Sequence, residues 1–324
     1  MVSRGDRQAS IAEQYRDFAT EARGKSPRYV ELANAVAEDP AVLEFLRALP
    51  KPKQQPNLLF AAACYLLGEH ADIDDLRTLI SRRDGRLAAT MRARRTQTNE
   101  AARCATLLPA LAQLPQPLAL IEVGASAGLT LLPDRYSYDY GERELAGTDP
   151  EAPVLTCEVR GPVPLPDKVP EVVWRAGLDL NPLDVSDDDD VRWLRSLLWP
   201  DETGRRERLD AAIATARRDP PPIRKGDLRT DVRGLARQAP ADATLVIFHS
   251  AVLAYVAPPD RAAFASAVRA LDAVWLSNEG PGVLPGVGAD LRVHAGFVLV
   301  KDGTTAKALT DGHGTWLEWL AGLS

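Results

Sequence analysis

The spacing of apolar residues changes near residue 115, and this change constrains the fold more than any other feature. Over residues 8–114, apolar side chains recur at steps of three and four, which is the spacing of amphipathic helices. Leu59, Ala62 and Leu66 show this spacing. After residue 115, short apolar runs alternate with helical patterns instead. We therefore expect a helical domain followed by a domain built on a sheet.

Several short apolar runs in the second part of the chain predict strands. They are Leu118–Val123, Val172–Leu180, Pro222–Gly226, Thr244–His249, Ala273–Ser277 and Gly296–Val300. Strands that alternate with helices favour a mostly parallel sheet covered on both faces, so we predict a doubly wound α/β fold. The turn signal Lys301-Asp302-Gly303 predicts an antiparallel hairpin at the end of the sheet.

We place the domain boundary at residue 114. Residues 1–114 then form the N-terminal helical domain, and residues 115–324 form the α/β domain. The α/β domain carries an insertion over residues 130–170. Its second half is rich in proline and is predicted to be a loop long enough to cover a site.

Two local patterns predict helix starts. Asp39 is followed by Pro40, a pair typical of an N-cap and a first helical turn. The acidic run Asp187–Asp190 precedes a helical pattern that begins at Val191, and negative charge favours a helix N-terminus. Consecutive helical residues point in different directions, so these aspartates alone do not predict a metal site.

Composition and motifs argue against several classes of protein. The 324 residues carry 39 basic and 45 acidic side chains, a net charge of -6, so we expect no general attraction to nucleic acid or to anionic membranes. No apolar run reaches the roughly 20 residues that span a bilayer, and residues 1–10 lack the apolar core of a secretory signal, so we expect a cytoplasmic protein. The three cysteines are widely spaced, and no metal-binding or P-loop motif occurs.

The strongest chemical signal is an apolar strand that runs into a turn of small residues. The strand Leu118–Val123 contains Glu122 near its end. Gly124, Ser126 and Gly128 follow, before an expected helix start. Small residues let a ligand approach the backbone closely, and a helix that begins there offers unpaired amide donors. A tight connection without a ligand is the alternative interpretation.

Polar residues also follow the other predicted strands. The second strand ends at Asp179, close to Asn181, and a carboxylate there can accept both hydroxyls of a ribose. The third ends in Gly226 and Asp227, which suit the edge of a purine, and the fourth ends in His249. Because the carboxyl ends of parallel strands share one edge, we expect these groups around one crevice where strand order reverses.

This succession of strand ends resembles the class I S-adenosylmethionine-dependent methyltransferase fold over residues 95–324. That family has an acid and three glycines after the first strand, and Ser126 stands here in place of the middle glycine. The resemblance implies S-adenosylmethionine as cofactor. The residues implied to bind it are Glu122, Gly124, Ser126, Gly128, Asp179, Asn181, Gly226 and Asp227.

The whole chain is also identified as a member of the domain-of-unknown-function family 2332. The phrases that carry this resemblance are Thr98–Arg103, Glu122–Leu132, Asp134–Tyr136, Gly177–Asp184, Trp193–Pro200, His249–Tyr255 and Ser277–Gly280. The methyltransferase resemblance supplies the expected function, transfer of a methyl group to a small or anionic acceptor.

Two residues are candidate catalytic bases. His249 ends the fourth strand, which faces the reactive group of the donor in the resembled fold. Glu279 follows the fifth strand. A buried structural role is the alternative for both residues.

Other polar residues are candidates for contact with the substrate. Asn99, Glu100 and Arg103 are placed on a helix that precedes the first strand, where they contact either the substrate or a buried polar network. Ser250 and Tyr255, after the fourth strand, are further candidates.

Two other functions remain open. One is a nucleotide-binding or interaction module without catalysis. The other is a serine hydrolase, because Gly124–Gly128 matches the GxSxG elbow with Ser126 as nucleophile, and His249, His294 and His313 follow downstream. The helical pattern before the turn and the lack of an upstream oxyanion motif count against the hydrolase.

The role of the basic stretch Arg82–Arg95 and the oligomeric state are also open. A solvated helix face is the simpler interpretation of the stretch, and attraction of an anionic substrate is the functional one.

Overall fold

The computed structural model describes residues 10–68, 71–82, 84–284 and 296–320. Contacts divide the chain into two compact units, each made of two segments. The first unit consists of Met1–Thr98 and Asp188–Glu207, and the second of Asn99–Asp187 and Arg208–Ser324. Residues 99–114, expected in the helical domain, thus belong to the second unit, and residues 188–207 belong to the first.

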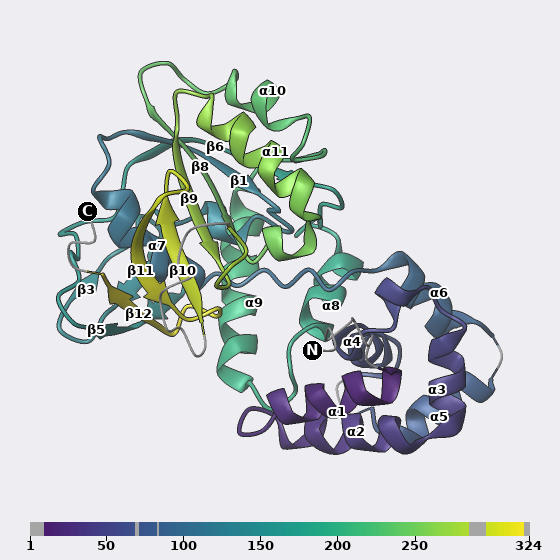
Figure 1. Cartoon of the computed structure of the whole chain (residues 1–324). Helices are drawn as coiled ribbons and strands as arrows, with labels where there is room; N and C mark the ends of the chain where they lie inside the picture. Colours follow the sequence, from purple (N-terminus) through teal and green to yellow (C-terminus); the bar gives the residue numbers. More distant parts are fainter. Residues whose placement is uncertain (1–9, 69–70, 83, 285–295, 321–324) are drawn as a thin grey trace, which may run out of the picture. The chain divides into compact units, whose positions relative to one another are not determined.

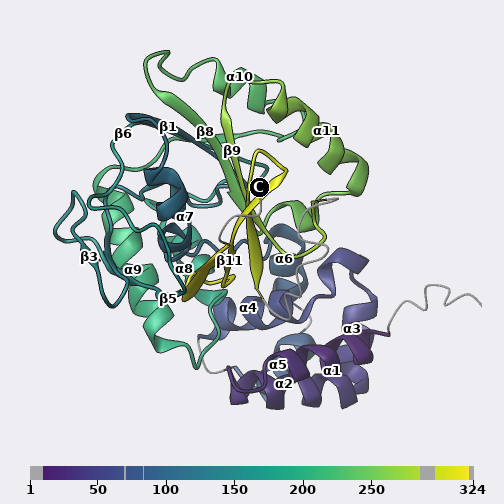
Figure 2. The same ribbon diagram turned by 60° about the vertical axis from the view of Figure 1, so that its left-hand side comes forward.

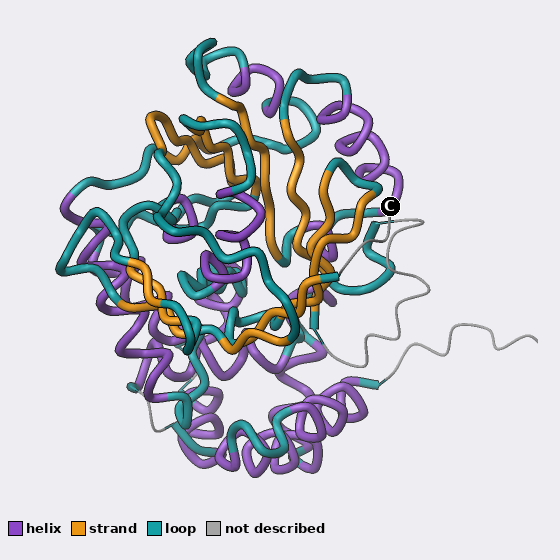
Figure 3. Tube along the Cα trace, turned by 90° about the vertical axis from the view of Figure 1, so that its left-hand side faces the viewer, coloured by secondary structure: helices purple, strands orange, loops and turns teal. Residues whose placement is uncertain are grey.

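The first unit consists of helices and loops, without a strand in its described residues (Figure 3). Its elements are α1 (Ile11–Glu21), α2 (Pro27–Glu38), α3 (Pro40–Arg47), the 3-10 helix η1 (Lys51–Lys53), α4 (Pro56–Leu67), α5 (Ile73–Ser81), α6 (Arg86–Ala93), α8 (Asp188–Ser196) and the start of α9 (Thr203–Arg218). The side chain of Asp39 accepts the amides of Ala41 and Val42 at 2.9 and 3.0 Å, which confirms the predicted N-cap.

Aromatic rings form the centre of the first unit. Phe60 in α4 is fully buried, and its ring centre lies 5.9 Å from Tyr15, 5.7 Å from Phe18 and 4.9 Å from Tyr29. Such pairs contribute about 0.5–1.5 kcal/mol each beyond the burial of their area. Phe60 thereby joins α4 to α1 and α2.

The second unit is built around a sheet whose described strands have the order β5-β12-β11-β10-β9-β8-β1-β6-β7. They are β1 (Leu118–Val123), β5 (Glu158–Arg160), β6 (Val172–Asp179), β7 (Ile223–Lys225), β8 (Thr244–Ser250), β9 (Val274–Glu279), β10 (Phe297–Lys301), β11 (Thr305–Thr310) and β12 (Trp316–Trp319). The strands β7, β6, β1, β8 and β9 are parallel neighbours, so that, numbered in chain order among these five, they stand in the order 3-2-1-4-5. Figure 2 shows β6, β1, β8 and β9 side by side in this order. The predicted parallel α/β sheet is confirmed, and its strand order reverses between β1 and β8.

The other end of the sheet is antiparallel. β10 pairs with β9 and β11, and β11 pairs with β12, which confirms the predicted hairpin. β5 adds to β12 in parallel at the edge. The sequence does not predict β5 or β12, because both are short.

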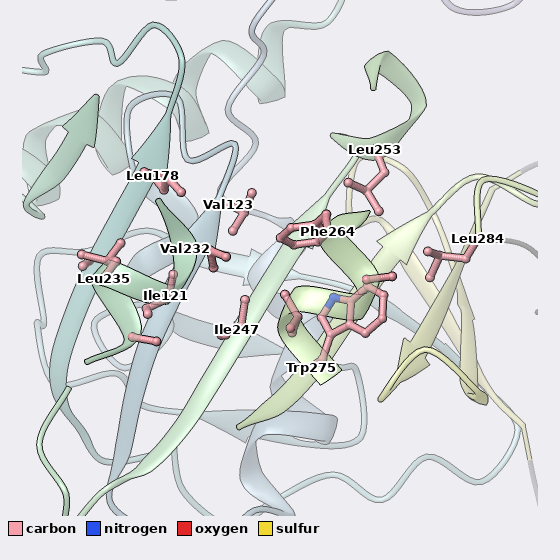
Figure 4. Close-up of a cluster of buried hydrophobic side chains, with 14 residues drawn as sticks. Ile121, Val123, Leu178, Val232, Leu235, Ile247, Leu253, Phe264, Trp275 and Leu284 are labelled. Atoms are coloured by element: carbon pink, nitrogen blue, oxygen red, sulfur yellow. The ribbon is translucent and has the colours of Figure 1, made fainter. Parts of the chain in front are cut away.

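Helices cover both faces of the parallel strands. These are α10 (Val232–Ala236) and α11 (Pro258–Arg269) on one face (Figure 1) and α7 (Arg103–Ala112) on the other. Side chains alternate along a strand, so Ile121 packs toward α10 and α11 and Leu120 packs toward α7. Figure 4 shows the first of these clusters, in which Phe264 of α11 and Trp275 of β9 are the largest side chains. No helix in the described part of the chain is long and apolar enough to span a membrane.

The predicted insertion contains a small second sheet of order β3-β2-β4. Its strands are β2 (Ser137–Asp139), β3 (Glu144–Leu145) and β4 (Val154–Thr156). Arg175 of β6 donates to both carboxylate oxygens of Asp134 at 2.8 Å each, which ties the start of the insertion to the main sheet. The sequence does not predict strands here, because each has only two or three residues.

Candidate functional site

The turn after β1 is a tight connection with an unusual backbone. Gly124, Ser126 and Gly128 have φ angles of 72°, 52° and 72°, in the left-handed region that favours glycine. The prediction of a helix after this turn is wrong, because the three-residue 3-10 helix η2 (Leu129–Leu131) stands there. The turn therefore lacks the row of free amides that an α-helix N-terminus presents.

The chain itself binds several amides of this turn. The Gly124 amide donates to the Leu178 carbonyl at 2.7 Å. The Ser126 amide donates to Oδ2 of Asp179 at 2.8 Å, and the Asn181 amide donates to Oδ1 at 2.7 Å. Asp179 is buried at the end of β6, the parallel neighbour of β1. Its carboxylate is thus held beside the glycine turn.

The end of β7 lies directly beside Asp179. The Gly226 amide donates to the Asp179 carbonyl at 2.9 Å. A Cβ atom on Gly226 would come within 2.7 Å of the Leu178 side chain, so this close approach requires glycine. Arg229 donates to the carboxylate of Asp227 at 2.9 Å, and this hydrogen bond lowers the pKa of Asp227 below its ordinary value.

The segment after β8 packs on the glycine turn. A Cβ atom on Gly124 would lie 2.4 Å from a methyl group of Val252, so the valine side chain contacts the backbone of the turn. Ala251, just before it, has a left-handed φ of 59°. Val252 therefore packs directly against the backbone of the glycine turn.

Glu122 of β1 is a buried acid, with 4% of its surface exposed. Its Oε1 accepts the hydroxyl of Thr130, and its Oε2 has no hydrogen-bond partner within the described residues. Burial raises the pKa of Glu122 to about 8, although Thr130 and the charge of Arg103 act in the opposite direction. The carboxyl group therefore carries a proton at neutral pH and loses it in mildly alkaline solution.

The placement of Asn99 and Glu100 on a helix is wrong, because residues 94–102 are loop and turn and α7 begins at Arg103. The Oδ1 atom of Asn99 accepts the Leu129 amide at 2.7 Å, at the end of the glycine turn. Glu100 accepts a hydrogen bond from Arg208 at 2.9 Å. Asn99 thus supports the candidate site directly, and Glu100 belongs to a partly buried ion pair.

Arg103 connects α7 to the end of β8 and to the turn after β11. Its guanidinium donates to the carbonyl of Ser250 at 3.1 Å and to that of Gly312 at 2.8 Å. The hydroxyl of Ser250 accepts from Asn278 at 3.2 Å, and Thr310 donates to Asn278 at 2.7 Å. Sequence reasoning missed Asn278 and Thr310. The signal that could have found them is a polar residue at the end of a predicted strand, beside the candidate residue Glu279 in the case of Asn278.

His249 is fully buried, and both of its ring nitrogens are engaged. The indole N–H of Trp275 is 3.0 Å from Nε2, and Glu279 is 2.7 Å from Nδ1. Because an indole N–H can only donate, Nε2 accepts and the proton resides on Nδ1. The ring also packs 5.7 Å from that of Phe264. The prediction of His249 as catalytic base does not agree with this geometry, which is that of a structural histidine.

Glu279 organises the segment that contacts the glycine turn. Its Oε1 accepts the amides of Val252 and Leu253 at 2.9 and 3.0 Å, in addition to Nδ1 of His249. Burial alone would raise the pKa of Glu279, but these hydrogen bonds outweigh burial and lower it. Glu279 is therefore an ionised, buried anchor for the backbone, and its predicted role as a base has no support here.

The predicted residues share one edge of the sheet but not one face. Glu122 is in register with Gly177 of β6 and Phe248 of β8, both in parallel, so the ends of these strands lie together. The side chain of Glu122 points toward η2 and α7, whereas that of His249 points toward α11. The glycine turn, Glu122 and Asp179 therefore form one candidate site, and the cluster of His249 lies behind it.

Other predicted residues lie elsewhere. Tyr255 belongs to η3 (Leu253–Tyr255) and is 74% exposed. In the first unit, Arg94 is bound by Asp189 and Asp190, so the basic stretch is not a uniformly solvated face. His294 lies outside the described residues.

Within the described ranges, no group of three or more histidine, cysteine or acidic side chains is placed to hold a metal ion.

Comparisons with known proteins identify a family for the chain. A sequence profile described as "Uncharacterized protein conserved in bacteria (DUF2332)" matches residues 12–319. Comparison with curated proteins and with solved structures gave no match.

Proposed function

The chain belongs to the DUF2332 family, and we propose that its second unit binds S-adenosylmethionine and transfers the methyl group to a small, anionic acceptor. The proposed donor site lies at the carboxyl ends of β1, β6 and β7. In open α/β sheets ligands bind at this edge, next to the point where strand order reverses.

The observation that carries the proposal is the position of the Asp179 carboxylate beside the turn that follows β1. The amides of Ser126 and Asn181 each use one oxygen, at 2.8 and 2.7 Å, and thereby fix the plane of the group. A fixed carboxylate at the end of the second strand suits the two hydroxyl groups of a ribose.

Two further acids fit the same donor. Asp227 follows β7, and its neighbour Gly226 is bonded to the Asp179 carbonyl, so the two acids stand at adjacent strand ends, as the ribose and base of one nucleoside require. The second acid is Glu122. A nearby cation lowers the pKa of a buried carboxyl group, so the positive charge of the bound donor would favour ionised Glu122 and be balanced by it.

The choice of an anionic acceptor follows from the state of His249. Bound S-adenosylmethionine supplies a methyl group on a sulfonium leaving group. The residues of the chain then have to align the acceptor and, for a neutral acceptor, remove a proton. Because both ring nitrogens of His249 are engaged, it cannot serve as this base without breaking its bonds. A carboxylate or another anion arrives already deprotonated and needs no base.

The same observation favours a second candidate function, donor binding without transfer. A module of this kind would keep Asp179 and the glycine turn and would lack a base. Two observations count against the serine hydrolase: His249 is committed to Trp275 and Glu279, and a short 3-10 helix rather than an α-helix follows Ser126.

Methyl transfer distinguishes the two candidates. The purified chain is incubated with S-adenosylmethionine and either small carboxylates or the matching alcohols, and S-adenosylhomocysteine is measured by mass spectrometry. We expect product with carboxylates and none with alcohols. Donor binding without product in either set would favour the non-catalytic module, and absence of donor binding would reject both.

A further inference from the structure

Two cations of the first unit, Lys53 and Arg95, lie side by side. Lys53 ends the 3-10 helix η1, and Arg95 belongs to the loop that follows α6. The ammonium of Lys53 donates to the carbonyl oxygen of Arg94 at 2.7 Å. This carbonyl is part of the peptide bond that links Arg94 to Arg95, so the ammonium stands next to the backbone of Arg95.

The backbone of Arg95 is fixed in this position. Its carbonyl oxygen accepts the indole N–H of Trp193 at 2.9 Å and the amide of Gln97 at 3.0 Å. Trp193 is fully buried in α8. The next residue of the loop, Thr96, donates to the side chain of Gln55 at 3.4 Å, just before α4. The packing of the unit therefore holds this part of the loop in place.

No acid forms an ion pair with either cation within the described residues. The elements that flank them in the sequence, η1, α6 and the first turn of α4, contain no acid. Asp189 and Asp190 of α8 are bound by Arg94 instead. Burial lowers the pKa of Lys53, and the charge of Arg95 lowers it further, as expected for a cation whose charged neighbour is another cation.

Both side chains keep N–H donors that a ligand can use. An ammonium has three donors, and the bond to Arg94 occupies one of those of Lys53. A guanidinium has five, and the described residues bind none of those of Arg95. Lys53 is partly buried and Arg95 is exposed, so solvent reaches the pair. The pair suits an oxyanion with two negative charges, because one such group neutralises both cations.

We propose that Lys53 and Arg95 form a binding site for the phosphomonoester group of a small molecule. The phosphate oxygens lie between the ammonium and the guanidinium. A nucleic acid is the less suitable ligand, because each of its phosphodiester groups carries one charge and the chain has a net charge of -6. The proposal does not rest on methyl transfer, because both residues belong to the first unit.

Calorimetric titration at low ionic strength with matched probes tests the site. Methyl phosphate is a dianionic monoester, and dimethyl phosphate is the corresponding monoanionic diester. At pH 7.5 we expect methyl phosphate to bind with a Kd of about 1 mM or below, and dimethyl phosphate to bind at least about tenfold more weakly. At pH 5 methyl phosphate should bind about fivefold more weakly, because the second pKa of a phosphomonoester is about 6. Equal affinity for the two probes, or no binding of methyl phosphate to the folded chain, would overturn the proposal.

Variants locate the binding. Arg95→Gln should weaken methyl phosphate about tenfold or more, since a charge-assisted hydrogen bond is lost, and this exposed position should leave the fold intact. Lys53→Gln should weaken it by a similar factor. Arg16→Gln, at an exposed position of α1 in the same unit, removes the same kind of charge and should leave the affinity within about twofold. Unchanged affinity in Arg95→Gln, or equal loss in Arg95→Gln and Arg16→Gln, would refute the site.

Discussion

The carboxylate of Asp179 accepts the backbone amide of Ser126, 53 residues earlier in the chain, at 2.8 Å. This hydrogen bond joins the ends of two parallel strands, β6 and β1, at the edge where we place the ligand. It also holds Ser126 in a left-handed conformation that a non-glycine residue rarely adopts. Asp179 therefore has a structural task and, in our proposal, a ligand to bind.

Replacement of Asp179 by alanine should affect both properties. Loss of the carboxylate leaves two amides without an acceptor, so the free energy of unfolding should fall by about 1–3 kcal/mol. Donor affinity should fall about tenfold or more, because a charge-assisted hydrogen bond is lost. Urea denaturation and calorimetry measure the two effects. Asp167→Ala removes an aspartate whose side chain is 94% exposed and should change neither.

The contact between Gly124 and Val252 can be tested by a double-mutant cycle. Gly124→Ala should lower the free energy of unfolding by about 2–3 kcal/mol, from the clash and from the left-handed backbone. Val252→Ala in the same chain should recover only part of this loss, since it removes the clash and leaves the backbone strain. Strict additivity of the two single changes would show that the side chains do not meet.

Stability should depend on the proton of Glu122. The folded pKa of Glu122 is about 8, above the ordinary value of 4.5, so the protonated form stabilises the fold, and this contribution is lost as pH rises toward and through 8. Between pH 6 and pH 8 the wild-type chain should lose about 2 kcal/mol more than Glu122→Gln, which cannot ionise. Urea denaturation at the two pH values gives the difference. Glu171→Gln, at an exposed position of the same unit, is the control and should lose as much stability as the wild type. An equal loss in the wild type, Glu122→Gln and Glu171→Gln would contradict the claim that folded Glu122 holds a proton at neutral pH.

Glu279 should show the opposite pH dependence. Its pKa is lowered in the fold, so its contribution is present above the unfolded pKa and is lost on acidification. Between pH 6 and pH 4 the wild-type chain should lose more free energy of unfolding than Glu279→Gln, by up to about 0.8 kcal/mol. Equal acid sensitivity of the two proteins would mean that the bonds to His249 and to the backbone do not hold the ionised form.

His249 should behave as a structural residue. His249→Ala removes a buried ring and leaves the Trp275 indole without its acceptor, so we expect a loss of about 2–5 kcal/mol in stability. Donor affinity, measured below the melting temperature of the variant, should stay within about threefold of the wild-type value. A folded variant that loses donor binding would show that His249 contributes to the donor site.

The strands of the parallel sheet could be predicted because their signals are local. Leu118–Val123 is an apolar run of strand length. The pair Asp39-Pro40 likewise predicts a helix start, because aspartate is a common N-cap and proline is common in the first helical turn. The short strand Val154–Thr156 gives no such signal, because its pairing with β2 rather than its composition makes it a strand.

Errors at the site come from contacts that sequence spacing does not reveal. Glycine and serine after β1 suggested a helix start, but Asp179 captures the Ser126 amide and the chain continues as a short 3-10 helix. The end-of-strand position of His249 suggested a base, but Trp275 arrives from the neighbouring strand and occupies Nε2. In both cases a residue far away in the sequence decides the role.

Calorimetric titration of the folded chain with S-adenosylmethionine, and separately with S-adenosylhomocysteine, tests the central claim most directly. Our account predicts saturable binding of both compounds with a Kd below about 1 mM, weakened about tenfold or more by Asp179→Ala and unchanged by Asp167→Ala. No detectable binding of either compound up to about 5 mM, with the protein shown to be folded, would contradict the proposed donor site.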